Sequence, residues 1–273
     1  MGEIAQDAAP VMEDVWTPQR IARFWDMVAQ EPRLRHLYFS QHYAKSIISV
    51  ARLFGMAGGK VMDYGCGPGY LSRELANSGF QTTGIEYSLE SANAANALMN
   101  GLPCWNGCFT NDTLPDSSRE NGFDWVFSVE AYEHLRDEWI KNYFLTINKY
   151  LKPGGTLVIS APNNENLDDS LIICPCCEAK FHRWGHLRSV APDDLRRIVE
   201  SHGFEVVLCN GIDLGQVSNL RVTIADRIIA RCGLGGNTCR RVSTDMVPMT
   251  MAIKRIIKKS KTRPHLLLIA RKL

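Results

Sequence analysis

The sequence predicts an α/β fold in which helices cover both faces of a mostly parallel sheet. Short apolar segments alternate with amphipathic segments over most of the chain, which is the pattern of a doubly wound sheet. The segment 61–70, Val-Met-Asp-Tyr-Gly-Cys-Gly-Pro-Gly-Tyr, also joins an apolar strand to a helix through a glycine-rich turn. At 273 residues the chain can bury one full core, so we expect one α/β domain with added segments.

The expected elements follow the order of a Rossmann-like fold with a seven-stranded sheet. The expected strands are 60–64, 81–86, 103–108, 123–128, 155–161, 204–209 and 265–271. The expected helices between them are 70–78, 89–99, 137–151 and 192–202. The segment Lys152-Pro153-Gly154-Gly155 is expected to form a structural turn before the fifth strand. Ligands of such sheets bind at the carboxyl ends of the strands.

The remaining segments are additions to this sheet. The first residues are expected to be disordered, the next to form a preface of two helices, and a basic helical insert to precede the last strand. Thr17 and Pro18 mark the start of the first helix as cap and first-turn proline. The expected parts are the tail 1–14, the preface 15–55, the core 56–211 and 265–273 with a Cys/His loop at 163–190, and the insert 212–264.

The net charge of +2 hides an asymmetry along the chain. Residues from 214 onward contain thirteen Lys and Arg but only Asp226 and Asp245 as acidic residues. These basic side chains could meet an anionic partner or the surface of a membrane, or could be a solvated helix face. No run of about 18 apolar residues is present, and the acidic N-terminus lacks the pattern of a secretion signal, so we expect a cytoplasmic protein.

Three glycines dominate the turn after the first expected strand. Gly65, Gly67 and Gly69 allow the backbone to approach a bound ligand, because side chains there would collide with it. A dinucleotide-binding fold would have G-x-G-x-x-G here, whereas this chain has G-C-G-P-G. Asp63 precedes the turn, and Glu86 ends the next strand 23 residues later. The turn therefore predicts a ligand that is cradled at the edge of the sheet.

The pattern D-x-G-C-G-x-G, followed by Gly84-Ile85-Glu86, resembles the S-adenosylmethionine site of class I methyltransferases. The resemblance covers roughly residues 43–207 and the final strand. It implies S-adenosylmethionine as the cofactor and makes the helical preface a cofactor lid, although packing alone explains the preface equally well. Asp63 would fix the turn and help to hold the methionine ammonium through water, while the glycine backbone packs against the carboxylate and ribose. Glu86 would accept hydrogen bonds from both ribose hydroxyls.

Two further positions complete the cofactor site that this resemblance implies. Asp112 follows the third strand and would receive the amino group of adenine; a simple Asx turn is the alternative. Ser128 closes the fourth strand and would lie beside the methionine part of the cofactor.

Directly after Ser128, the sequence places Glu130, Glu133 and His134 near the carboxyl end of the fourth strand. This E-x-x-E-H resembles the metal-binding motif of small-RNA 2′-O-methyltransferases and of ubiquinone-pathway O-methyltransferases. In the former a histidine after the fifth strand is the fourth ligand, a place that His186 fits. Two carboxylates and two imidazoles suit Mg²⁺, Mn²⁺ or another borderline divalent cation. A cation there would lower the pKa of an acceptor hydroxyl, so we expect metal-assisted methylation of oxygen.

Other interpretations of these residues stay open. Glu133 and His134 could cap the following helix without binding a metal. His134 is the best general base if there is no catalytic metal, since its unperturbed pKa lies near neutrality. The expected catalytic residues are therefore His134, Glu130 and Glu133.

The Cys/His loop suggests a second metal site. Cys174 and Cys177 form a C-x-x-C, and His182 and His186 follow as an H-x-x-x-H. Thiolates and imidazoles at these spacings suit a tetrahedral zinc ion. His186 could belong to this zinc site or to the catalytic metal with the cysteines nearby, and a loop without metal is the third alternative.

The resemblance implies methylation of a hydroxyl on a small molecule or saccharide, and a sugar diol or catechol would suit a metal. RNA 2′-O-methylation is the main alternative. It predicts aromatic residues among the basic ones, but no Trp, Tyr or Phe occurs after position 204, so nucleic acid is the less favoured acceptor. A non-catalytic, cofactor-binding protein of the same fold is a further alternative, against which the intact turn and the E-x-x-E-H motif argue.

Overall fold

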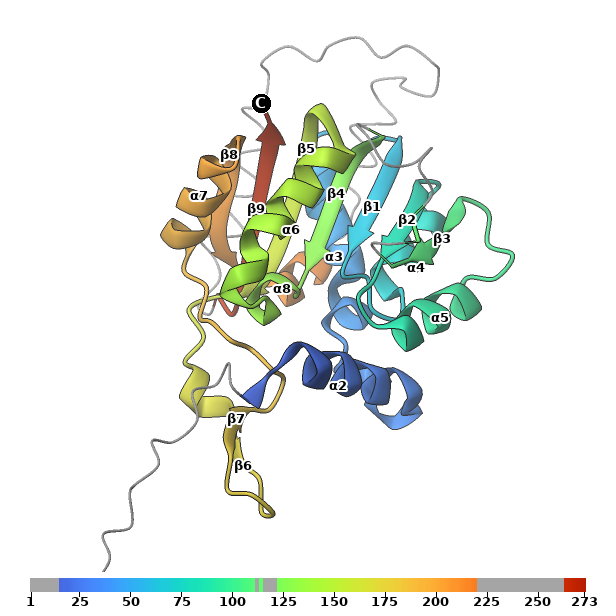
Figure 1. The fold of residues 1–273 in the computed structure, drawn as a ribbon. Helices are drawn as coiled ribbons and strands as arrows, with labels where there is room; N and C mark the ends of the chain where they lie inside the picture. Colours follow the sequence, from blue (N-terminus) through green and yellow to red (C-terminus); the bar gives the residue numbers. More distant parts are fainter. Residues whose placement is uncertain (1–14, 111–112, 115–121, 220–262) are drawn as a thin grey trace, which may run out of the picture.

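The computed structural model describes residues 15–110, 113–114, 122–219 and 263–273, and a seven-stranded sheet forms its centre (Figure 1). The strands lie in the order β3-β2-β1-β4-β5-β9-β8. Their bounds are β1 Lys60–Tyr64, β2 Gln81–Ile85, β3 Trp105–Phe109, β4 Phe123–Val129, β5 Leu151–Pro162, β8 Phe204–Ile212 and β9 His265–Lys272. The first five pair in parallel, and β9 lies antiparallel between β5 and β8. The predicted Rossmann-like sheet is confirmed.

The order in which strands are added to the sheet reverses at β1. From there β2 and β3 are added on one side, and β4 and β5 on the other. Asp63 near the end of β1 is in register with Gly84 of β2 and Phe127 of β4. The segments that follow these three strands therefore meet at one edge, where open α/β sheets bind their ligands.

Helices cover both faces of the sheet (Figure 1). The helices are α2 Pro18–Gln30, α3 Phe39–Leu53, α4 Tyr70–Asn77, α5 Leu89–Leu98, α6 Asp137–Tyr150, α7 Pro192–Ser201 and the short α8 Leu214–Asn219. Side chains of α3, α4 and α8 share one apolar cluster, and those of α6 and α7 share another. The helices α4 to α7 begin at the predicted residues and end one residue earlier, because the predicted last residue is in each case the C-cap.

The strand β4 shows how both faces of the sheet are buried. Phe127 packs into the cluster under α3 and α4, and the adjacent Val126 packs into the cluster under α6 and α7. Both side chains are fully buried. Because successive residues of a strand point to opposite faces, a strand covered on both faces is apolar over most of its length, as this one is apart from Asp124 and Ser128.

The strand β5 begins earlier than predicted. It starts at Leu151, so the expected turn over 152–155 lies inside the strand rather than before it. Phe123 pairs with Leu151, but Trp125, two residues on, pairs with Thr156. The extra residues form a bulge in which Gly154 has a left-handed φ of 72°. The predicted strand boundary was wrong because pairing with β4 begins before the proline and the glycines.

The first helix of the preface, α2, lies across the carboxyl ends of the parallel strands, while α3 packs on one face of the sheet (Figure 1). Thr17 caps α2 by accepting a hydrogen bond from the N–H of Arg20, and Pro18 occupies the first turn, as predicted. A short 3₁₀ helix, Pro32–Leu37, connects α2 to α3. The Ser88 hydroxyl at the start of α5 donates a hydrogen bond to the Asp26 carboxylate of α2, over 2.5 Å. This bond holds the preface over the binding edge of the sheet.

The Cys/His loop contains a small hairpin of its own. Its strands, β6 Leu171–Ile173 and β7 Lys180–His182, pair antiparallel after a 3₁₀ turn at Leu167–Ser170. In Figure 1 the hairpin projects away from the sheet on the same side as α2. The loop after β7 returns to the carboxyl ends of the strands, so its histidines can reach the binding edge.

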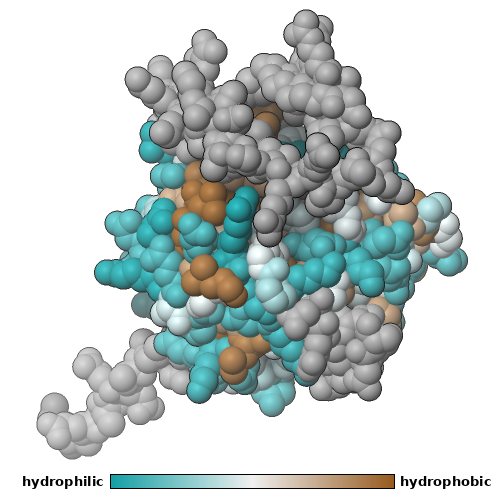
Figure 2. Space-filling model, turned by 90° about the horizontal axis from the view of Figure 1, so that it is seen from above, coloured by the Kyte–Doolittle hydropathy of each residue, from teal (hydrophilic) through white to brown (hydrophobic). Residues whose placement is uncertain are grey.

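The opposite end of the molecule has a different surface. Figure 2 looks down on the amino ends of the parallel strands, where hydrophilic side chains prevail among the described residues and hydrophobic ones form separate patches. None of the described helices has the length and apolar character needed to cross a bilayer. The predicted tail 1–14 and the helices expected within 220–262 lie outside the described residues.

Candidate active site

The glycine turn has the conformation that its sequence predicts. Gly65, Gly67 and Gly69 all have left-handed φ values, of 76°, 52° and 85°. A Cβ atom at Gly69 would lie 2.5 Å from Cε of Met99, the C-cap of α5, and 3.1 Å from Cβ of Ala95 within α5, so this glycine also permits close packing of the turn. A Cβ at Gly65 would lie 3.0 Å from that of Ala131, which follows β4. The turn therefore depends on glycine for both its backbone conformation and its close approach to β4.

Asp63 stabilises the turn from inside the protein. Its carboxylate is buried and accepts a 2.7 Å hydrogen bond from the hydroxyl of Ser72 in α4. Burial raises the pKa of Asp63 to about 7, with a further upward contribution from Glu86 and a lowering effect of the Ser72 hydrogen bond included in that value. Asp63 thus joins β1 to α4 around the turn, which fits the predicted structural role.

Glu86 lies at the point where the turn meets the end of β2. Its Oε2 accepts a 2.7 Å hydrogen bond from the N–H of Gly67, and its Oε1 accepts bonds of 2.8 and 3.0 Å from the N–H groups of Tyr87 and Ser88. Burial raises its pKa, and these three amide hydrogen bonds act in the opposite direction. The amides fix the carboxylate in one orientation, with its remaining lone pairs available to a ligand.

One cavity joins this turn to the E-x-x-E-H segment. It has a volume of about 560 Å³ and is lined by Gly65, Gly67 and Glu86 from the first region and by Glu130 and His134 from the second. The remaining wall is largely aromatic and apolar. It comprises Ile21, Phe24, Trp25, Val28, Leu37, Tyr38, Phe39, Tyr64, Val129, Leu135, Trp139, Tyr143 and Trp184, among others. The cavity can therefore hold two molecules, or the parts of two, side by side.

At the second region the structure brings Glu133, His134 and His186 together. One potential ligand atom from each lies within 4.8 Å of the others. Glu133 is fully buried, and neither of its carboxylate oxygens has a hydrogen-bond partner among the described residues. Burial first, and then the charge of Glu130, raise the pKa of Glu133 well above its usual range. A buried carboxylate without a partner is costly unless a proton or a cation neutralises it.

Hydrogen bonds fix the tautomer that each of the two imidazoles in this cluster has when it is neutral. Nδ1 of His134 lies 3.2 Å from the carbonyl oxygen of Gly185, which can only accept, so Nδ1 donates. Nδ1 of His186 donates in the same way to Oε2 of Glu165 over 2.5 Å. In the neutral form of each ring Nε2 keeps its lone pair, and Nε2 of His134 lies 3.9 Å from Oε1 of Glu133. Burial lowers the pKa of His134 to about 3, so its ring is neutral, as a metal ligand must be.

His182 has the opposite arrangement. Its Nδ1 accepts hydrogen bonds from the backbone N–H groups of Trp184 and His186, at 3.4 and 3.2 Å. The ring proton therefore lies on Nε2, which faces Oε1 of Glu165 at 3.4 Å. Burial raises the pKa of Glu165, but its contacts with His186 and His182 together bring it below its usual value. Glu165 thus faces both imidazoles, and Glu165, His182 and His186 form a second group of potential metal ligands, with one atom of each within 4.8 Å of the others.

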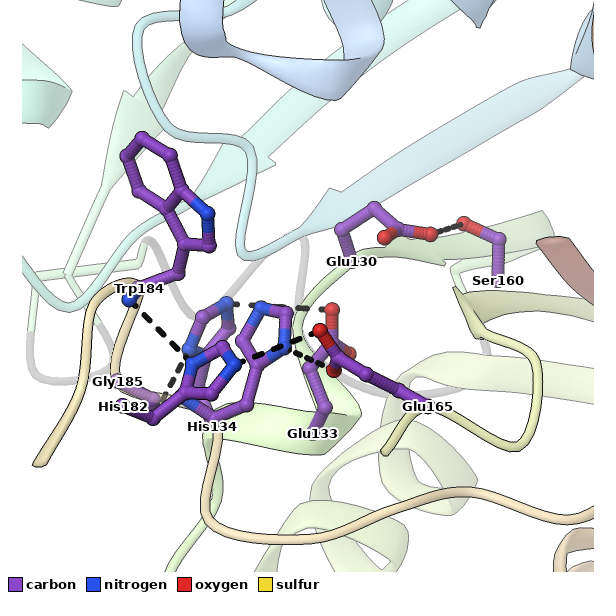
Figure 3. Close-up of polar contacts among 9 residues, drawn as sticks. Glu130, Glu133, His134, Ser160, Glu165, His182, Trp184 and Gly185 are labelled. Atoms are coloured by element: carbon purple, nitrogen blue, oxygen red, sulfur yellow. Dashed lines mark hydrogen bonds and ion pairs between the residues drawn. The ribbon is translucent and has the colours of Figure 1, made fainter. Parts of the chain in front are cut away.

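Glu130 lies apart from this cluster. It has a left-handed φ of 50°, its N–H donates to the carbonyl oxygen of Ser160, and its Oε1 accepts a 2.9 Å bond from the Ser160 hydroxyl. Burial raises the pKa of Glu130 to about 8. Figure 3 shows the side chain turned toward Ser160 of β5 and away from the histidines. The structure therefore brings three of the four predicted ligands of the divalent cation together and leaves Glu130 on the cavity wall.

The sequence of the chain matches the methyltransferase domain family over residues 36–208, which is more than half of its length. The chain belongs to this family. Its sheet and helices are those of the class I S-adenosylmethionine-dependent methyltransferases, as the glycine turn predicted.

Two relatives and one solved structure illustrate the similarity. A ubiquinone biosynthesis O-methyltransferase of Idiomarina loihiensis is 32% identical over 168 residues, 58% of this chain and 66% of the relative. One of Colwellia psychrerythraea is 26% identical over 215 residues, 73% of this chain and 85% of the relative. The crystal structure of the [4+2]-cyclase SpnF superposes with a TM-score of 0.59 at 19% identity, over 98% of this methyltransferase and 99% of SpnF. The matched part spans 66% of the Idiomarina protein.

Of the predicted cofactor residues, Gly65, Gly67 and Glu86 line the cavity, whereas Asp63, Gly69 and Ser128 do not. Ser128 is fully buried within the sheet, beneath the lining residues Val129 and Glu130. Asp112 lies outside the described residues of the methyltransferase. The assignments of Ser128 and Asp112 to the cofactor stay predictions.

The four residues of the predicted zinc site are not brought together in the methyltransferase. Cys174 and Cys177 lie at the tip of the β6–β7 hairpin, while His182 pairs with Leu171 at its base. His182 and His186 both face Glu165 instead. The groups of three or more potential ligands in the described part of the chain contain no cysteine. The hairpin thus separates the thiols from the imidazoles.

Sequence reasoning missed Glu165. It lies three residues after the end of β5, at the carboxyl edge where ligand-binding residues gather. That position is a signal in the sequence, since a carboxylate close behind an apolar strand is a candidate site residue in this fold. Its contact with two histidines could not be predicted, because it depends on the path of the loop that returns from the hairpin.

Proposed function

We propose that this methyltransferase transfers the methyl group of S-adenosylmethionine to a hydroxyl oxygen of a small molecule with an aromatic or apolar body, with the assistance of a divalent cation. The observation that carries the proposal is the single cavity lined both by the cofactor turn and by the E-x-x-E-H segment. Methyl transfer is an in-line displacement, so donor and acceptor must be held in contact within one cavity. The O-methyltransferase names of the two relatives support oxygen as the acceptor atom.

The cofactor end of the cavity is set by Glu86 and the glycine turn. The Glu86 carboxylate already accepts three backbone amides, so it is oriented before a ligand binds. A preorganised carboxylate suits a pair of adjacent hydroxyls, as on a ribose. We assign Glu86 to the ribose of S-adenosylmethionine and the turn to its methionine part.

The acceptor end is aromatic. Trp25 of α2 packs edge-on against the His134 ring, with 5.2 Å between ring centroids, and Trp184 also lines the cavity. Such walls bind an aromatic ring better than a saccharide, whose many hydroxyls would need polar partners. A catechol, which combines an aromatic body with vicinal oxygens, is therefore the preferred acceptor class.

The residues beside the acceptor fit a divalent cation. Glu133 has two unpartnered buried oxygens, and His134 and His186 each have a free Nε2 held in place by a hydrogen bond from Nδ1. One carboxylate and two nitrogens favour Mn²⁺ or Zn²⁺ over Mg²⁺, which prefers oxygen ligands. When bound, the cation would lower the pKa of the acceptor hydroxyl. Glu165, behind His186 and His182, holds the rings without binding the cation itself.

The hydroxyl proton needs an acceptor as the new carbon–oxygen bond forms and the carbon–sulfur bond of the cofactor breaks. Glu130 lines the cavity and does not belong to the cluster, and Ser160 orients its carboxylate. We assign Glu130 the role of proton acceptor. His134 is less suited to this role, because its Nδ1 is bound to Gly185 and its Nε2 faces Glu133.

The test is an acceptor panel with the full chain and labelled S-adenosylmethionine. The panel contains a catechol, a phenol, a sugar with vicinal hydroxyls and a short RNA. We expect a methyl ether of the catechol, loss of activity on chelation, recovery with Mn²⁺ or Zn²⁺, and loss of activity in Glu133→Gln. Formation of S-adenosylhomocysteine with RNA alone would replace the proposed acceptor. Binding of the cofactor without turnover of any acceptor would support the non-catalytic alternative.

A further inference from the structure

The tip of the β6–β7 hairpin has the backbone conformation of a metal-binding knuckle. The N–H of Cys174 donates to the carbonyl oxygen of Ala179, and the N–H of Glu178 donates to the carbonyl oxygen of Cys174, both over 2.9 Å. Glu178 has a left-handed φ of 56°, which closes the turn tightly behind Cys177. The turn Cys174-Pro175-Cys176-Cys177-Glu178 is therefore folded back so that its first and fourth residues lie near each other.

The sulfur of Cys174 is surrounded by donors. The backbone N–H groups of Cys176 and Cys177 hydrogen-bond to it, as does the thiol of Cys177, and these contacts lower its pKa. Amides directed at a sulfur stabilise a thiolate, which is the form that binds metals. The turn therefore allows the sulfurs of Cys174 and Cys177 to bind one metal ion together.

The described part of one chain supplies only half of a tetrahedral zinc site here. His182, the nearest histidine in the sequence, lies at the other end of the hairpin and faces Glu165. In the described part of the chain, no third Cys, His, Asp or Glu joins Cys174 and Cys177 as a potential ligand. Structural zinc sites are closed by four protein ligands. Two further ligands must therefore come from elsewhere.

The surface next to these cysteines indicates where they come from. All three residues of β6 are exposed, and Ile172 and Ile173 are accessible to 42% and 61%. This places an apolar strip directly beside the two thiols on a hairpin that projects from the body of the protein (Figure 1). A second copy of the chain would present the same strip and the same two thiols, so a two-fold contact would cover both strips.

We propose that Cys174 and Cys177 from two copies of this chain bind one Zn²⁺ ion through four thiolates and so join the hairpins of the two copies. The four sulfurs complete the tetrahedral set, and the apolar residues of β6 pack against those of the second copy. The site lies at the opposite end of the hairpin from His182, so it does not depend on the proposed methyl-transfer site.

The test uses the full chain, with zinc content and mass in solution measured together. We expect a dimer containing one zinc ion per two chains at this site, which becomes monomeric on chelation. The Cys177→Ser variant should lose this zinc and the dimer. The matched variant Cys176→Ser changes an exposed cysteine of the same turn and should keep both. Substitution with Co²⁺ should give thiolate-to-metal charge-transfer absorption in the wild type and in Cys176→Ser, but not in Cys177→Ser.

The absorption separates this site from any metal bound at His134 and His186, which has no thiolate. A monomer that binds the same ion through cysteines and loses it in a Cys232→Ser, Cys239→Ser double variant would overturn the two-copy site. A Cys174–Cys177 disulfide, or a wild type without thiolate absorption, would overturn the proposal altogether. Circular dichroism of each variant confirms that the substitution at the exposed tip leaves the fold intact.

Discussion

The carboxylate of Glu165 accepts a hydrogen bond from His186 over 2.5 Å between Oε2 and Nδ1, and this contact determines which ring nitrogen of His186 is left for a metal. A neutral imidazole that donates from Nδ1 can coordinate only through Nε2. Because Nε2 of His186 then lies beside Glu133 and His134, one carboxylate outside the cluster defines the chemistry inside it. The same carboxylate faces His182, which in turn accepts the N–H of His186.

Replacement of Glu165 should therefore weaken metal binding without removing a ligand. We expect Glu165→Ala to lower the affinity for Mn²⁺ or Zn²⁺ by about 10- to 100-fold, because the His186 ring loses its orienting acceptor. Metal titration by calorimetry, with the cysteines of the hairpin replaced by serine, measures the change. Asp168→Asn removes an exposed carboxylate of the same loop and should leave the affinity unchanged. An unchanged affinity in Glu165→Ala would show that His186 does not bind the metal.

Glu130 and Ser160 should separate proton transfer from metal binding. We expect Glu130→Gln to lower kcat by about 10²- to 10⁴-fold, since the hydroxyl proton loses its acceptor, while metal affinity stays near that of the wild type. Ser160→Ala should have a smaller effect in the same direction, because it only frees the carboxylate to rotate. Steady-state kinetics and metal titration on the same preparations check both expectations. A Glu130→Gln protein that has lost its metal would make Glu130 a ligand instead.

The sequence predicted the sheet and the cofactor turn more accurately than the residues of the histidine cluster, for physical reasons. Local patterns determine β1, the glycines and α4, so their positions were predictable to within a residue. The bulge in β5 was not, because it reflects the register with β4 rather than the preference of proline and glycine. The sequence also did not show that Glu165, and not Glu130, lies next to the histidines. The position of Glu130 depends on its left-handed backbone, and that of the histidine loop depends on the packing of Trp16 against Gly185.

Glu86 offers a direct test of the cofactor site. Glu86→Ala removes the acceptor of three backbone amides and the proposed partner of the ribose, so S-adenosylmethionine should bind about 100-fold more weakly. Glu90→Gln, in the first turn of α5, serves as the control and should bind normally. Calorimetric titration with S-adenosylhomocysteine gives the affinities, and thermal unfolding shows whether the turn itself has loosened. Equal binding by both variants would place the cofactor elsewhere.

Asp63 should make the stability of the ligand-free protein depend on pH. Its pKa is raised from 3.8 to about 7 in the folded state, so between roughly pH 4 and 7 the folded state holds more protons than the unfolded state. The contribution of this group to the free energy of unfolding therefore falls as the pH rises through that window, and levels off above it. The full effect is of the order of 4 kcal/mol.

The Asp63→Asn variant should lack this dependence. Its amide oxygen can still accept the Ser72 hydroxyl, so the variant should be more stable than the wild type at pH 8 and gain less on acidification. Urea unfolding of both proteins at pH 5.5 and pH 8 measures the difference. If Asp63 also helps to hold the ammonium of the cofactor, the same variant should bind S-adenosylmethionine more weakly at pH 8. A variant that is less stable at both pH values would indicate that the carboxylate is held by stronger contacts than the Ser72 bond.

The identity of the acceptor should depend on Trp25 more than on any group of the cofactor site. Its ring lies edge-on to His134, so an aromatic acceptor near the cluster would contact it directly. Trp25→Leu should raise KM for a catechol by about tenfold through the loss of ring contacts, and leave the affinity for S-adenosylhomocysteine within about twofold. Met27, on the same helix, is 54% exposed, so Met27→Leu controls for changes in α2. If Trp25→Leu weakened the cofactor and the catechol equally, the helix would act as a lid over the cofactor, and acceptor selection would rest with Trp184 and the loop that carries it.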